Sequence, residues 1–98
     1  MNEPVSPLWA VLVKVKLDMD TSPQHRRSIL EEYVVPEYRE LPGFLLASWM
    51  NDGNGTGLCL VEFETEEHAR GAVEALTAHG GPEVIEWSVY AVEFEASG

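Results

Sequence analysis

Residues 41–70 read LPGFLLASWMNDGNGTGLCLVEFETEEHAR, and this stretch decides the fold. Residues 44–50 and 58–64 each have the length and the apolar and aromatic composition of a strand. Between them, residues 51–57 hold only Asn, Asp, Gly and Thr, which are typical of turns. We therefore predict a β-hairpin, followed by a helix that Thr65 opens as its N-cap.

Residues 8–17 predict another strand, because their second half alternates in polarity. The two faces of this strand hold Val11, Val13 and Val15 on one side, and Leu12, Lys14 and Lys16 on the other. A last strand is predicted over residues 83–94, which are rich in Val, Ile, Trp, Tyr and Phe.

A helix is predicted from Pro23 to about residue 41, with Ser22 as its N-cap and proline in its first turn. Pro36 interrupts this helix and is expected to kink it or to split it in two, because proline has no backbone N–H. The helix that begins after Thr65 should bury a stripe that includes Ala69 and Ala72. Residues 1–7 carry two prolines and are expected to form a loose arm.

The predicted element order is β-α-β-β-α-β over a single domain of residues 1–98. This order is that of the ferredoxin-like split βαβ unit, an α+β fold. In it, a four-stranded antiparallel sheet carries both helices on one face. The spatial strand order is 4-1-3-2 if both crossovers are right-handed.

The face of the sheet without helices, called the open face below, should carry Leu12, Leu58 and Leu60. A lone domain would expose these leucines to water, so we expect a homodimer that buries the open face against a second copy. The lysines at 14 and 16 point to the same face. We expect them to form cross-strand ion pairs with Glu62, Glu64 or Glu86.

Composition excludes several classes of protein. With 17 acidic and 6 basic residues, the formal net charge is −11, which argues against binding to nucleic acid or to an anionic membrane. The single cysteine rules out an internal disulfide. No leader or apolar run long enough to span a membrane is present, so we expect a cytoplasmic protein. The three histidines are too scattered in sequence to predict a metal site.

The stretch from Leu41 to Ala69 resembles the dimeric α/β-barrel superfamily, and within it the small proteins similar to antibiotic-biosynthesis monooxygenases. In that group, a Pro-Gly-Phe corner ends the first helix, here at Pro42–Phe44. A strand with a small residue, a glycine-containing turn and a third strand follow. An aromatic residue, here Phe63, stands just before a Ser/Thr–Glu helix start.

The resemblance implies a homodimer with a pocket in each subunit between the sheet and the helices. It also implies, for the polyketide-oxidising members, an oxidoreductase in which oxygen reacts directly with a phenolic substrate without any cofactor. Those members have a tryptophan at the end of the third strand, where this chain has Phe63. They have an asparagine earlier on the same strand, and Cys59 is the nearest match to it here. Those members also have a polar ring, such as histidine, on the second strand, and the matching position in this chain is near Trp49 or Met50.

Two functions stay open at this point. One is a cofactor-independent monooxygenase-like enzyme acting on an aromatic or polyketide-type substrate; the other is a non-catalytic dimeric module that binds a ligand or a partner. In both cases a cavity of roughly a few hundred cubic ångströms would fit a flat aromatic ligand. The residues predicted to line it are Tyr33, Tyr38, Trp49, Cys59, Phe63 and His68.

Overall fold

A computed structural model describes residues 8–78, 84–96 and 98. The predicted loose arm, residues 1–7, and the first residue of the predicted last strand, Glu83, lie outside the described residues. The strands in the described part are β1 (Trp9–Lys16), β2 (Phe44–Asn51), β3 (Thr56–Phe63) and β4 (Val84–Ala91). The helical segments are α1 (Pro23–Ile29), the π-helical η1 (Leu30–Val34), α2 (Val35–Arg39) and α3 (Glu66–Ala78).

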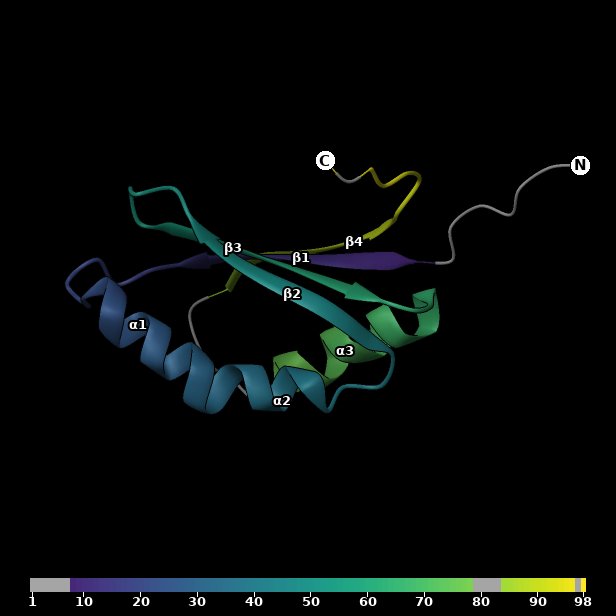
Figure 1. The fold of residues 1–98 in the computed structure, drawn as a ribbon, viewed down its shortest axis with the longest axis horizontal. Coiled ribbons are helices and arrows are strands. Elements are labelled where there is room, and N and C mark those ends of the chain that lie inside the picture. Colours follow the sequence, from purple (N-terminus) through teal and green to yellow (C-terminus); the bar gives the residue numbers. More distant parts are fainter. Residues whose placement is uncertain (1–7, 79–83, 97) are drawn as a thin grey trace, which may run out of the picture.

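The four strands form one antiparallel sheet with the hydrogen-bonded order β2-β3-β1-β4, which is 4-1-3-2 counted from the other edge. Figure 1 shows the helical segments together on one side of this sheet. The chain is thus an α+β protein, and its arrangement is compatible with the predicted ferredoxin-like fold.

The hairpin turn is tighter than predicted, because Asp52 organises it. The Asp52 carboxylate accepts the backbone N–H groups of Asn54 at 2.7 Å and of Thr56 at 3.1 Å. Gly53 and Gly55 supply the positive φ angles, 73° and 94°, that the chain needs to reverse. As a result β3 begins at Thr56, two residues earlier than the sequence indicates.

Pro36 interrupts the first helical run by widening a turn. The backbone N–H of Val35 donates to the carbonyl of Leu30, five residues back, so the segment before the proline is π-helical. A proline ring in a regular α-helix would collide with the carbonyl four residues earlier, and the wider turn avoids this collision. The predicted interruption is therefore confirmed, although α1, η1 and α2 follow one another without a gap.

The core lies between the sheet and α3. Val11, Val61 and Phe63 are fully buried, and they alternate with residues of the open face along β1 and β3. Ala69 and Ala72 are buried against them, because small residues allow α3 to approach the sheet closely. No residue of α1, η1 or α2 is buried to the same degree.

The open face carries Leu12, Leu58 and Leu60, each half-buried, as predicted. Cross-strand pairing adds Leu46 and Met50 of β2 to it, with 42% and 46% of their surface exposed.

The expected ion pairs of the two lysines are not formed. Lys14 lies opposite Leu58 and Glu86, and Lys16 lies opposite Thr56. Neither lysine makes an ion pair with a residue that the structure describes. Glu62 instead lies opposite Ala10, at the other end of the sheet.

The last strand is shorter than predicted. It ends at Ala91, and residues 92–96 leave the sheet on the side away from the helices (Figure 1).

Candidate functional site

The structure brings together three of the six residues that the sequence predicts at a pocket. Tyr38 comes from α2, Trp49 from β2 and Cys59 from β3, and we call these three the Tyr38 cluster. Trp49 and Cys59 are direct cross-strand partners. The rings of Tyr38 and Trp49 lie 5.4 Å apart between centroids at an angle of 53°. The Tyr38 hydroxyl and the Cys59 thiol interact closely enough for each to shift the pKa of the other.

Burial keeps the polar groups of the Tyr38 cluster uncharged. It raises the pKa of the Cys59 thiol to about 12, against a small opposing effect of the Tyr38 hydroxyl. Burial also raises the pKa of Tyr38, and the neighbouring Cys59 adds to this shift. A thiol with such a pKa is not a nucleophile near neutral pH. The Tyr38 cluster can therefore donate hydrogen bonds in an apolar layer, but Cys59 cannot start a covalent reaction there.

Phe63 lies deeper and is a core residue. Its side chain is fully buried and meets the ring of Phe44 edge-on at 6.4 Å between centroids. Tyr33 lies at the other extreme. Its side chain is 69% exposed and belongs to no part of the core. Leu30, Val34 and Tyr38 form the inner stripe of this helical run, and Tyr33 falls on the solvent side of it.

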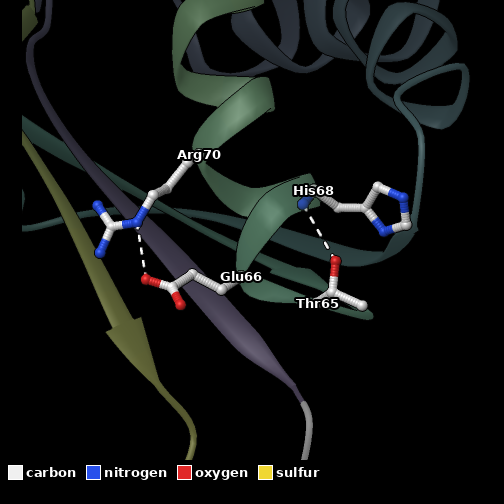
Figure 2. Close-up of polar contacts among 4 residues, drawn as sticks. All are labelled: Thr65, Glu66, His68 and Arg70. Carbon is white, nitrogen blue, oxygen red and sulfur yellow. Dashed lines mark hydrogen bonds and ion pairs between the residues drawn. The ribbon is translucent and has the colours of Figure 1, made fainter.

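His68 stands in the first turn of α3, apart from the Tyr38 cluster. Its backbone N–H donates to Thr65 Oγ1 at 3.1 Å, which confirms Thr65 as the N-cap (Figure 2). Its ring points away from the ion pair between Glu66 and Arg70 (Figure 2). The ring Nδ1 is buried and has no hydrogen-bond partner among the residues that the structure describes.

The ring of His68 packs on the backbone of Gly43. A Cβ atom placed on Gly43 would overlap Nδ1 and would lie 2.5 Å from Cγ. The sequence identifies the Pro-Gly-Phe corner, but it gives no sign that a histidine 25 residues later closes against it. The only local signal is the glycine itself, whose φ of 73° few other residues adopt.

Two hollows in the described part of the chain lie elsewhere. One, of about 480 Å³, opens between α2 and α3 and is lined by Glu37, Glu40, Leu41, Ala75 and Leu76. The other, of about 490 Å³, lies beyond the end of β1, at residues 16–20. Neither is lined by any of the six predicted residues. The Tyr38 cluster is packed as core here, and a ligand pocket at that place stays a prediction.

Within residues 8–78, 84–96 and 98, no group of three or more His, Cys, Asp or Glu side chains could hold a metal ion. None of the helices in these ranges is long and apolar enough to cross a membrane. His25, in the first turn of α1, is exposed.

A scan of the chain against models of protein families and a search of curated proteins each found no match. The resemblance of residues 41–69 to the dimeric α/β-barrel proteins therefore stays a prediction.

Proposed function

We propose that this protein is a non-catalytic dimeric binding module, in which two copies join through their open faces into an α/β barrel. One observation carries the proposal: none of the helices in the described part of the chain covers the open face (Figure 1), and its apolar residues adjoin one another. Met50 lies opposite Leu58, and Leu12 lies opposite Leu60, so these apolar side chains adjoin one another across three strands, with Lys14 beside Leu58 and Ser48 beside Leu60. Burying such a patch against an identical one is the simplest way to remove it from water.

Charge supports the same arrangement. Lys14 and Lys16 lie toward one end of the open face, where Glu86 stands opposite Lys14, and Glu62 and Glu64 lie at the other end, because β1 and β3 are antiparallel. Consider a two-fold axis that lies between the two packed faces and runs perpendicular to the strands. It would place the lysine end of one copy over the glutamate end of the other. Such complementarity fixes the orientation of two copies more than it adds to their affinity.

The interior supports binding rather than catalysis. The thiol and the phenol of the Tyr38 cluster are neutral near pH 7, and burial raises the pKa of each, so they stay neutral to higher pH than in water. A small aromatic ligand that entered this layer would meet an aromatic wall and one hydroxyl, which suits recognition.

The test is the mass of the protein in solution. Sedimentation equilibrium at about 10 µM should show a dimer for the unmodified chain. Leu60→Lys places a charge in the centre of the patch and should give a folded monomer. Ile29→Lys is the matched control, since Ile29 is 40% exposed on α1, away from the open face. A monomer for the unmodified chain up to about 100 µM would exclude the proposal.

A second function, a cofactor-independent monooxygenase, is favoured by one observation, the buried and unpartnered Nδ1 of His68. This nitrogen lies at the Pro-Gly-Phe corner that carries the resemblance. In that function Nδ1 would accept the hydrogen bond of a phenolic substrate. We expect 2-naphthol binding, measured by calorimetry, and oxygen uptake to be lost in His68→Ala. Both should be kept in Tyr33→Phe, the exposed control. If the unmodified protein neither binds 2-naphthol nor takes up oxygen, the enzyme is excluded.

A further inference from the structure

The turn between β2 and β3, at one end of the sheet (Figure 1), contains three pairs of residues with the same potential chemistry. They are Asn51 with Asp52, Asp52 with Gly53, and Asn54 with Gly55. In each pair, Cγ of the first side chain can join the backbone nitrogen of the second residue and close a cyclic imide. Asparagine is a thermolabile residue, and a following glycine has no side chain to shield its nitrogen. The order of residues alone does not say which pair reacts.

Hydrogen bonds hold the first two pairs. Asn51 Oδ1 accepts the N–H of Gly53 at 2.9 Å, and the N–H of Asp52 donates to the carbonyl of Thr56 at 3.0 Å. Asp52 Oδ1 accepts the N–H groups of Thr56 and Asn54, and these bonds lower the pKa of Asp52. Its carboxyl group is therefore ionised near neutral pH, and an ionised carboxylate resists attack by a nitrogen. In both pairs the attacking N–H and the side chain under attack are already engaged.

The third pair, Asn54 and Gly55, is free of such bonds. Asn54 is exposed, and its side-chain amide makes no hydrogen bond with a residue that the structure describes. The same holds for the backbone N–H of Gly55. The space is open as well, because a Cβ on Gly55 would meet only Met19 Cγ, at 3.9 Å, among the described residues. The Gly55 nitrogen can therefore approach Asn54 Cγ without breaking a hydrogen bond or displacing a side chain.

We propose that Asn54 is a site of spontaneous deamidation, the position in this turn that the hydrogen bonds leave open. The Gly55 nitrogen loses its proton to base and forms a bond to Asn54 Cγ, and the side-chain nitrogen leaves as ammonia. Water then opens the cyclic imide. Cleavage between Cγ and the ring nitrogen leaves an aspartate, whereas cleavage between the backbone carbonyl carbon and that nitrogen leaves an isoaspartate. The net change is the gain of water and the loss of ammonia, with no oxidation or reduction.

The isoaspartate product lengthens the turn, because its backbone runs through Cγ and gains a carbon atom before Gly55. In the unmodified turn, Asp52 binds an N–H on each side of this link, at Asn54 and at Thr56. The carbonyl of Gly55 also accepts the N–H of Leu17, just beyond β1, at 2.8 Å. A longer link shifts Gly55 relative to Asp52, so these bonds lose their alignment. The modification therefore loosens the contact between the turn and the end of β1.

Incubation of the full-length protein at pH 8 and about 37 °C, followed by digestion and mass spectrometry, tests the proposal. The peptide that contains the turn should gain about 1 Da, and its fragment ions should place the gain at position 54. Asn54→Ser should show no gain, because serine has no side-chain carbonyl to attack. A gain at Asn51 instead would overturn the proposal. The absence of any gain at position 54, while the same chain reacts there in urea, would overturn it as well.

The variant Asp52→Asn separates the effect of the hydrogen bonds from that of the sequence. It gives the turn two Asn-Gly pairs, and the new amide oxygen can still accept the N–H groups of Asn54 and Thr56. In the folded variant, position 54 should react at least about fivefold faster than position 52, the ratio that one hydrogen bond of ordinary net strength gives. Equal rates in the folded variant would overturn the proposal. If circular dichroism shows that this variant does not fold, the comparison of Asn54 with Asn51 in the unmodified chain decides.

Hydrogen exchange of the separated isoaspartate product, measured by nuclear magnetic resonance, tests the effect on the turn. The amide of Leu17 should exchange at least about fivefold faster than in the unmodified chain, again the equivalent of one hydrogen bond. Asn54→Asp is the matched control, because it carries the same new charge on a backbone of ordinary length. It should keep the protection of Leu17. Equal exchange in the isoaspartate product and in Asn54→Asp would overturn the lengthened turn.

Discussion

Gly43 shows how a single residue can join two distant parts of this fold. It turns the chain from α2 into β2 with a φ of 73°, and it leaves the space that the ring of His68 occupies. Two separate requirements therefore meet at one position: a backbone conformation that L-residues avoid, and the absence of a side chain. Gly53 has the same φ of 73° but no atom near its missing Cβ, so it meets the first requirement only.

We predict that Gly43→Ala lowers the free energy of unfolding by about 2–4 kcal/mol. About 1 kcal/mol comes from the left-handed backbone, and about 1–3 kcal/mol comes from the collision with His68. Gly53→Ala should cost only the backbone part, about 1 kcal/mol. The double change Gly43→Ala with His68→Ala should recover the steric part in urea unfolding. Equal losses in the two single variants would show that the packing of His68 on Gly43 carries no energy.

The pair of Tyr38 and Cys59 predicts a loss of stability in alkali. The pKa of Cys59 is raised from 9.0 to about 12 in the folded protein, so the unfolded chain loses this proton first. The free energy of unfolding should therefore be flat below pH 8.5 and fall as the pH rises from about 9 toward 12. Cys59→Ala should make the fall smaller. Fast reaction of the native thiol with a disulfide reagent at pH 8 would contradict this prediction.

At the scale of the elements, the two N-caps have equal chemistry but unequal surroundings. Ser22 accepts the N–H of His25 at 3.2 Å at the start of α1, and Thr65 does the same for His68 at the start of α3. The difference lies in packing. Residues of α3 are buried against β1 and β3, whereas no residue of α1 is buried. The same local bond therefore supports the whole domain in one case and one helical turn in the other.

We predict that Thr65→Ala lowers the global free energy of unfolding by about 1 kcal/mol, the usual cost of a lost N-cap. Ser22→Ala should change it by less, and should instead speed the amide exchange of α1 alone. Urea unfolding and native-state hydrogen exchange measure the two effects. A larger global loss for Ser22→Ala than for Thr65→Ala would mean that α1 is part of the cooperative core.

At the scale of the whole molecule, net charge opposes association. Each copy carries a formal charge of −11, so two copies repel each other even if the ends of their open faces are complementary. Salt screens this repulsion, because the Debye length falls from about 30 Å at 0.01 M to about 3 Å at 1 M. The burial of apolar surface is not weakened in the same way.

We predict that the dissociation constant of the proposed dimer falls severalfold when sodium chloride is raised from about 0.01 M to 1 M at pH 8. Sedimentation at a series of salt concentrations measures it. A rise of the dissociation constant with salt would mean that ion pairs, rather than the apolar patch, hold the two copies together.

The sequence by itself determined the features that depend on neighbours within a few residues. The caps Ser22 and Thr65, the turn at Asp52 and the interruption at Pro36 follow from local chemistry, and the structure has them all. The alternation of Val11 and Leu12 placed each residue on the correct face, because side chains alternate along any strand.

Only the tertiary structure decided which residues from distant segments meet. Tyr33 and Tyr38 look alike in the sequence, yet the first is exposed and the second packs against the core and the ring of Trp49, because the widened turn and α2 orient them differently. Contacts of this kind depend on the path of the backbone through space, which residue spacing along the chain does not specify.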